Sequence, residues 1–286
     1  MSPWKAIGWT VAFMLLGMSA SVTVMSLWAL ARYGSVADGL MRALAAGPEQ
    51  VLVAGASQVL GFGFATWAIG FRALRLRRWD LRLAPARIGV KGWAIGLMIG
   101  TGAAGFALLG SVLVAHSHWM PDDGGVREYG IQVLKTLLVL APAALSEEIM
   151  FRGLPLVLVA AALGRGTALV LVAGLVFALF HILNPGVTAL GLGNIALAGI
   201  FLGVAFYAPG GLWTAFGAHL GWNATLAALD APVSGLPFDI PLLDYCAGSP
   251  EWLSGGRFGP EGGLLATVAI TAALLVTMRW ARKETL

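Results

Sequence analysis

The sequence predicts an all-α fold, a polytopic membrane bundle of about eight transmembrane helices. Hydrophobic residues make up 58% of the chain, charged residues make up only 11%, and the mean hydropathy is +0.83, which is far from the composition of a soluble domain. Charge-free runs recur along the chain, and a helix of roughly 20 apolar residues crosses a membrane. These runs leave no space for a separate soluble domain of ordinary size. We therefore expect a single transmembrane domain over residues 1–286.

Seven of the expected spans contain no Asp, Glu, Lys or Arg. Four are uninterrupted runs at residues 6–31, 50–71, 92–115 and 262–278. Three more follow from the stretch between Arg165 and Asp230, which has no charged residue and is divided by Asn-Pro-Gly at 184–186 and Pro-Gly-Gly at 209–211. We expect these three spans near residues 167–183, 188–207 and 211–229.

The eighth expected span, residues 130–163, differs from the others because it carries charge. Lys135 lies near one end, and Glu147, Glu148 and Arg152 lie in the middle. A charged side chain at the middle of a membrane helix costs about 2.5–3.5 kcal/mol on insertion scales. Three such charges therefore need partners or a water-filled cavity, and we expect the polar site that they mark, a candidate active site, in the interior of the bundle.

The distribution of basic residues predicts the orientation. Arginines and lysines crowd the connection at residues 72–91 and the last residues of the chain, and cytoplasmic connections are enriched in such residues. With eight crossings, both termini are cytoplasmic and the acidic connections near 122–128 and 230–261 lie outside. The net charge of +4 therefore reflects topology and indicates no nucleic-acid partner. The topology and the lack of an organellar signal fit a multi-pass protein of a cell membrane, and we expect the inner membrane of a bacterium.

Small residues recur four apart in two of the expected spans. They are Gly92, Gly96 and Gly100 in one and Gly199 and Gly203 in another. This spacing lets the backbones of two membrane helices approach closely. It predicts helix packing at both places.

The three charges in the eighth span divide into a pair and a remaining carboxylate. Glu148 and Arg152 are four residues apart, on one helical face, where a carboxylate and a guanidinium pair well. Glu147 lies about 100° round the helix from Glu148 on the 3.6-residue period, so we expect it to face another part of the bundle and to lack a local cation. A carboxylate in that setting can accept a proton from water and return it later.

Two of the four histidines lie in expected spans. His116 and His118 belong to an outer connection, whereas His181 follows Phe177 by four residues and His219 precedes Asn223 by four. A spacing of four puts two side chains on one helical face, so His219 and Asn223 can direct hydrogen-bond donors to one point. Helix lengths leave His219 shallower in the membrane than Glu147 and His181, a difference that the sequence does not resolve.

These residues form three ordered motifs, Glu147-Glu148-x-x-x-Arg152, Phe177-x-x-x-His181 and His219-x-x-x-Asn223. The set resembles the CAAX-processing and bacteriocin-processing (CPBP, formerly Abi) family of intramembrane endopeptidases. The resemblance covers about a third of the chain, and it implies a catalytic core over residues 128–229.

The resemblance also implies a mechanism. Glu147 with His181 would activate a water for attack on a peptide carbonyl, His219 with Asn223 would stabilise the oxyanion, and Glu148, Arg152 and Phe177 would support the site. Two histidines and a glutamate can also ligate zinc, but the zinc-protease motif His-Glu-x-x-His is missing. We therefore expect no metal and no other cofactor.

The expected partners are the lipid bilayer and a peptide or membrane-protein substrate, lipidated or not. Two alternatives remain open at this point. A proton-coupled transporter also places Glu, His and Arg at mid-membrane, but it predicts symmetric broken helices in two halves. A non-catalytic scaffold or immunity protein of the same fold predicts that Glu147→Gln is tolerated.

Overall fold

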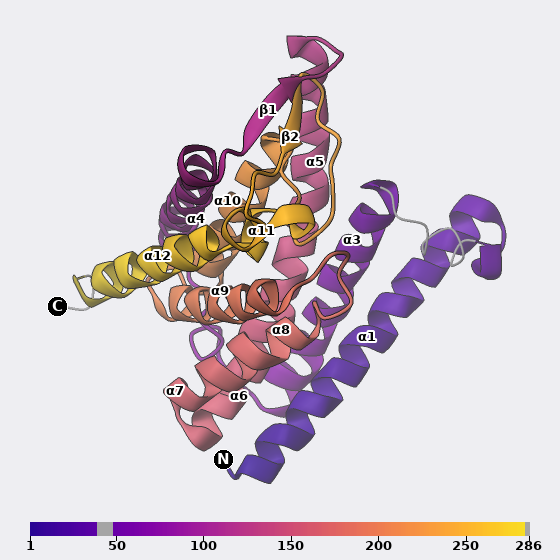
Figure 1. Cartoon of the computed structure of the whole chain (residues 1–286). Helices are drawn as coiled ribbons and strands as arrows, with labels where there is room; N and C mark the ends of the chain where they lie inside the picture. The colour runs from indigo at the N-terminus through magenta and orange to yellow at the C-terminus, as the bar shows by residue number, and fades with distance from the viewer. Residues whose placement is uncertain (39–47, 284–286) are drawn as a thin grey trace. The chain divides into compact units, whose positions relative to one another are not determined.

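The computed structural model describes residues 1–38 and 48–283, and the chain divides into two compact units. The first unit comprises Met1–Leu83 and Leu138–Ala168, and the second comprises Ala84–Leu137 and Leu169–Leu286. Both are mainly helical (Figure 1). The single transmembrane domain expected over residues 1–286 stays a prediction.

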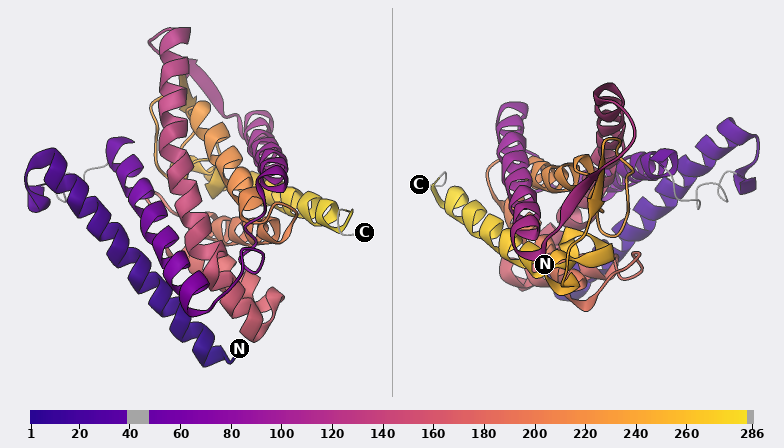
Figure 2. Two further views of the ribbon diagram at one scale, coloured as in Figure 1. Left: turned by 180° about the vertical axis from the view of Figure 1, so that it is seen from behind. Right: turned by 45° about the horizontal axis from the view of Figure 1, so that its top comes forward.

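In the first unit, helices α1 (Pro3–Tyr33) and α3 (Pro48–Ala65) lie side by side (Figures 1 and 2). Small residues form the contact. A Cβ atom added to Gly17 would lie 2.3 Å from the ring of Phe62, and one added to Gly61 would lie 2.6 Å from the carbonyl oxygen of Gly17. Both distances are too short for a side chain, so the glycines allow the close approach of the two helices.

The rest of the first unit is a helical path with two π-helical turns. The π-helix η1 (Thr66–Ala73) continues α3, and α5 (Val126–Glu147), which begins in the second unit, ends in the first. There follow the π-helical turn η2 (Glu148–Arg152), α6 (Leu154–Leu163) and the short α7 (Arg165–Ala168). The span expected at residues 130–163 is thus helical, with a break at Gly153.

In the second unit, α4 (Ala86–Ala115) packs closely against α10 (Leu212–Ala228). A Cβ atom added to Gly96 would lie 2.2 Å from the carbonyl oxygen of Thr214, and one added to Gly100 would lie 2.0 Å from that of Ala218. The predicted packing role of these glycines is confirmed. The contact fixes the position of α10, which carries His219.

The remaining helices of the second unit are η3 (Leu169–Val176), α8 (Phe177–Leu179), α9 (Ala189–Tyr207) and α12 (Leu264–Lys283). Helix α9 packs on η3 through Gly199, where an added Cβ atom would lie 1.8 Å from the carbonyl oxygen of Ala173. The second predicted glycine contact is therefore also present.

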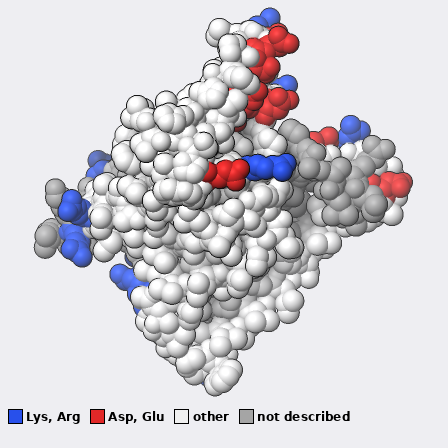
Figure 3. Space-filling model, in the orientation of Figure 1, with Lys and Arg blue, Asp and Glu red and all other residues white. Residues whose placement is uncertain are grey.

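Five helical segments of the described chain are long and apolar enough to cross a membrane, and they are Pro3–Tyr33, Glu49–Ala73, Ala86–Ala115, Ala189–Tyr207 and Leu264–Arg282. The face drawn in Figure 3 is mostly uncharged, as lipid-facing surface requires. The all-α membrane class is confirmed. Of the other expected spans, those near residues 167–183 and 211–229 are helical over shorter lengths, and the one at 130–163 begins with the 22-residue α5 but carries charges. The total of eight crossings therefore stays a prediction.

A small sheet in the second unit departs from the purely helical expectation. Strands β1 (His118–Pro121) and β2 (Leu243–Cys246) pair antiparallel, with Trp119 opposite Tyr245. The indole Nε1 of Trp119 also donates a hydrogen bond of 2.7 Å to the carbonyl of Leu229, just past α10, where helix carbonyls lack helical partners.

The long connection after α10 is ordered rather than a plain loop. It contains β2, the short helix α11 (Glu251–Ser254) and the 3-10 turns η4 (Gly256–Phe258) and η5 (Pro260–Gly262). Near its start, the carboxylate of Asp230 accepts the N–H groups of Ile240 at 2.9 Å and Tyr245 at 3.1 Å.

Candidate functional site

The first motif lies where α5 passes into a π-helical turn. Glu147 ends α5, and the N–H of Gly153 donates to the carbonyl of Glu148 five residues earlier, at 3.0 Å, which is the bonding pattern of a π-helix. Arg152 Nη1 donates to Glu148 Oε1 at 3.0 Å, and both side chains are 0% exposed. The predicted ion pair is therefore present and fully buried.

Glu147 is not without a cation, contrary to the expectation from the sequence. The guanidinium of Arg152 is attracted to Glu148 most strongly and also to Glu147. The π-helical turn gives the reason, because it brings residues five apart onto one side, whereas an ordinary α-helix separates them. Arg152 is thus bonded to Glu148 and also interacts electrostatically with Glu147.

A contact to α3 holds the end of α5 in place. The hydroxyl of Ser146 lies 3.0 Å from Oε1 of Gln58 and 2.8 Å from the carbonyl of Ala143. A Cβ atom added to Gly55 would lie only 2.8 Å from the backbone nitrogen of Ala143. Neither Gln58 nor Ser146 was predicted as part of the site, although polar side chains inside apolar spans were the available signal.

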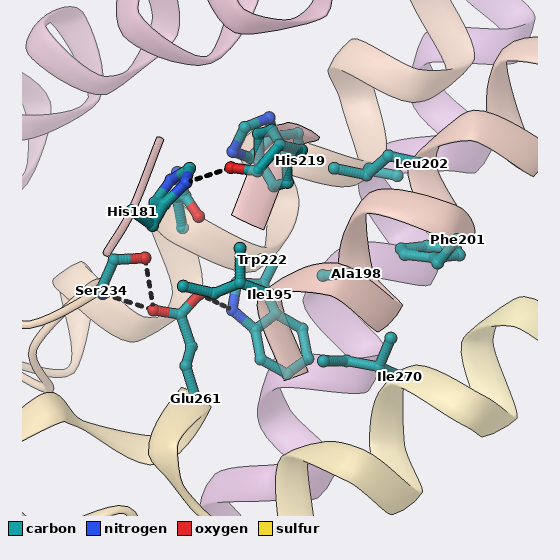
Figure 4. A pocket seen from close by; sticks show the side chains of 13 residues that line it. His181, Ile195, Ala198, Phe201, Leu202, His219, Trp222, Ser234, Glu261 and Ile270 are labelled. Carbon is teal, nitrogen blue, oxygen red and sulfur yellow. Dashed lines mark hydrogen bonds between the residues drawn. The ribbon is translucent and has the colours of Figure 1, made fainter. Parts of the chain in front are cut away.

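The second unit contains a cavity of about 40 Å³, and roughly 10–15 Å³ is enough for one water molecule. Figure 4 shows the side chains that surround it. Its polar lining consists of His181, His219, Asn223, Ser234 and Glu261, and its apolar lining comes mainly from α9, α10 and α12. The cavity therefore has room for water and several polar groups to bind it.

His181 lies just beyond a helix and not within one, which corrects the expected span at 167–183. Helix α8 ends at Leu179, and the N–H of His181 donates to the carbonyl of Ala178 at 2.9 Å, a bond over three residues. Pro185 follows soon after and cannot donate a helical hydrogen bond. The chain therefore turns here and carries His181 to the cavity.

The imidazole of His181 has a defined hydrogen-bond partner. Its Nδ1 lies 2.9 Å from the carbonyl oxygen of Phe177. A carbonyl only accepts, so Nδ1 carries the hydrogen in this contact. In the neutral ring, Nε2 is then the atom with an available lone pair.

Phe177 links the two histidines. Its ring centroid lies 4.7 Å from that of His181 and 6.2 Å from that of His219, the latter edge to face at 84°. Both histidines line the same cavity, so the difference in depth calculated from helix lengths does not separate them. The reason is that the helix ends at Leu179 and the chain turns before His181, so the rise per residue of a helix does not give its depth.

Asn223 lies one helical turn after His219 on α10, and both line the cavity as their spacing predicted. The second and third motifs are thus brought together within the second unit. The catalytic and supporting roles expected for Glu147, His181, His219, Asn223, Glu148, Arg152 and Phe177 stay predictions.

Glu261 was not predicted as a site residue, because its position in the sequence places it in the acidic connection expected outside. It is 9% exposed and lines the cavity. Burial raises the pKa of the Glu261 carboxyl, and hydrogen bonds from Ser234 and Trp222 oppose that rise because they favour the ionised form. Its place just before a charge-free span was the only signal in the sequence.

Metal binding needs several ligands in one place. Within residues 1–38 and 48–283, no group of three or more His, Cys, Asp or Glu side chains is arranged to hold a metal ion. The expectation of a metal-free and cofactor-free site stays a prediction.

The helices and these buried polar sites define a multi-pass helical membrane protein. Residues 129–225, about a third of the chain, match a family model named Rce1-like, whose description is type II CAAX prenyl endopeptidase Rce1-like. The match includes all three motifs and confirms the family resemblance predicted from them. It supports a CAAX-type intramembrane protease fold and indicates a hydrolase. No curated protein and no solved structure matches the chain.

Proposed function

We propose that this protein is an intramembrane endopeptidase that hydrolyses peptide bonds with a glutamate-activated water. The family match over residues 129–225 and the apolar helices support this class of activity. The observation that carries the proposal is the water-sized cavity of the second unit. The lining of this cavity includes His181 of the second motif and His219 and Asn223 of the third.

In the proposed reaction, Glu147, assisted by His181, takes a proton from water as the water oxygen attacks the carbonyl carbon of the scissile bond. Nε2 of His181 is proposed to accept a hydrogen bond from this water, since Nδ1 is engaged with Phe177. The C–N bond then breaks, and the leaving amine receives the proton that had been taken from water.

His219 and Asn223 are the proposed donors to the oxyanion that forms on the attacked carbonyl. They are four residues apart on α10 and line one cavity. In well-studied hydrolases one such donor contributes about 2.7–4 kcal/mol to transition-state stabilisation. Glu148 and Arg152 would support the first motif, and Phe177 would hold the two imidazoles.

The proposed substrate is a peptide or a segment of a membrane protein, including lipidated chains, because the matching family model describes prenyl endopeptidases. The proposed location is a cell membrane with both termini in the cytoplasm, since the basic connections are expected inside. The active core would correspond to residues 128–229 together with the cavity-lining residues that follow.

The test uses the full chain, purified in detergent, and a library of fluorescence-quenched peptides. We expect the wild-type protein to cleave members of the library, and Glu147→Gln and His181→Ala to lose cleavage. Glu251→Gln and His118→Ala are matched controls, because both side chains are exposed, and they should cleave normally.

The same assay separates the alternatives. Equal cleavage by wild type and Glu147→Gln would refute the catalytic assignment, and absence of cleavage throughout would favour a transporter or scaffold. A chelator is expected to leave the activity intact. Loss of activity with chelator and its recovery with zinc would overturn the metal-free mechanism.

A further inference from the structure

Glu261 is a buried carboxyl group at the cavity that belongs to none of the three motifs. It lies in η5, directly before α12, and is 9% exposed. Figure 4 shows its carboxyl group between Ser234 and Trp222. A buried acid of this kind needs hydrogen-bond partners, and those partners indicate what it does.

Both carboxyl oxygens of Glu261 accept hydrogen bonds. Oε1 accepts from Trp222 Nε1 at 3.0 Å, and Oε2 accepts from the Ser234 hydroxyl at 2.9 Å and from the Ser234 backbone N–H. An indole N–H and a backbone N–H can only donate. The site therefore requires two acceptor oxygens, and an amide would set its NH₂ group against one of the donors.

The hydrogen bond to Trp222 connects Glu261 to the helix that carries the proposed oxyanion donors. Trp222 lies on α10, directly before Asn223 and three residues after His219. Its indole is 7% exposed. The hydrogen bond from Trp222 to Glu261 therefore fixes the orientation of this part of α10 relative to η5.

The hydrogen bonds to Ser234 connect Glu261 to the turn that carries His181. The carbonyl of Ser234 accepts a hydrogen bond of 3.0 Å from Asn184 Nδ2, and the N–H of Asn184 donates to the carbonyl of His181 at 3.1 Å. A Cβ atom added to Gly235 would lie 2.1 Å from the carbonyl oxygen of Pro185. The segment at 234–235 thus packs directly on the His181 turn.

Asn194 holds Glu261 from the side of α9. Its Nδ2 donates to the backbone carbonyls of Glu261 and Gly263, both at 2.8 Å, and its Oδ1 accepts from Thr267 at 2.6 Å. The backbone of η5 is therefore held by α9 and α12, and the Glu261 carboxyl group is free to bond Trp222 and Ser234 from a fixed position.

We propose that Glu261 is a positioning residue, which joins α10 to the His181 turn and so sets the separation of His181 from Asn223 across the cavity. This inference rests on the proposed peptide hydrolysis. Glu261 is not the water-activating base, because its oxygens are already engaged by Trp222 and Ser234. It acts on the reaction through the groups that it holds.

The first measurement compares kcat and KM of Glu261→Gln, Glu261→Asp and wild type, each expressed per folded enzyme. A displacement of about 1 Å at a catalytic group can lower the rate about 100-fold. We expect Glu261→Gln to lower kcat by about this factor with KM nearly unchanged, and Glu261→Asp to recover part of it, since it keeps two acceptor oxygens. Glu251→Gln is the matched control in the same connection.

A double-mutant cycle separates positioning from general loss of structure. In an Asn223→Ala background, the oxyanion donor is already gone, so Glu261→Gln should lower the residual rate much less than it does in the wild type. Equal factors in both backgrounds would overturn the inference. So would a Glu261→Gln protein with the kcat of wild type.

Histidine NMR gives a readout that does not depend on cleavage. The chain has four histidines, so selective labelling yields few signals. We expect Glu261→Gln to shift those of His181 and His219 and to leave those of His116 and His118 in place. Unmoved His181 and His219 signals would overturn the positioning role, whereas moved signals in a protein that cleaves no peptide would refute only the proposed function.

Discussion

The buried ion pair of Glu148 and Arg152 gives a stability prediction that can be worked out from the structure. Arg152→Met removes the guanidinium and leaves the Glu148 carboxylate buried without the partner that lies at 3.0 Å. Removing one member of a buried pair costs about 3–5 kcal/mol. Both side chains are 0% exposed, so the full desolvation penalty applies.

The double variant Glu148→Met/Arg152→Met provides the decisive comparison. It removes both charges of the pair and keeps long side chains in the space, and such replacements are often neutral or stabilising by about 1–4 kcal/mol. The interaction of Arg152 with Glu147 is lost in the single and the double variant alike. We therefore expect the double variant to be more stable than Arg152→Met alone. At about 1.4 kcal/mol per factor of ten, a loss of 4 kcal/mol is roughly a thousandfold change in the unfolding constant.

Reversible unfolding in lipid bicelles measures these differences. Arg77→Met is the control in the same unit, because the ion pair of Arg77 with Asp80 is exposed and its distance is 3.3 Å, and exposed pairs contribute little. The reasoning fails if Arg152→Met is as stable as wild type, or if the double variant is no more stable than the single one.

Two further predictions concern packing and topology. In the same unfolding assay, Gly100→Ala should destabilise the protein by about 1–3 kcal/mol, because the added Cβ atom would lie 2.0 Å from the carbonyl oxygen of Ala218. Gly102→Ala on the same helix is the control and should be neutral, because no atom lies within 4 Å of its added Cβ. Cys246, the single cysteine, should react with a membrane-impermeant maleimide in intact cells, and labelling only after lysis would contradict the proposed orientation.

The sequence was sufficient for the membrane class, the helix-packing glycines and the Glu148–Arg152 pair. These features depend on local properties, namely apolar length, a spacing of four and opposite charges on one helical face. The structure also contains the helices expected at the charge-free runs, because in a bilayer the backbone must satisfy its own hydrogen bonds.

The geometry around the motifs depended on details that local periodicity does not contain. The π-helical turn at Glu148–Arg152 extends the influence of Arg152 to Glu147. The turn after Leu179 takes His181 out of the helix and onto the cavity that His219 also lines. A regular 3.6-residue count misses both, since each is a departure from the α-helical pattern.

What the sequence by itself determined is which side chains are too polar for an apolar helix and how they are spaced. Only the tertiary structure decided that Glu261, 38 residues beyond Asn223 along the chain, comes back to the same cavity. The physical reason is that its partners, the Trp222 indole and Ser234, come from separate segments. Their convergence is a property of the packed fold, and no repeat or spacing in the sequence encodes it.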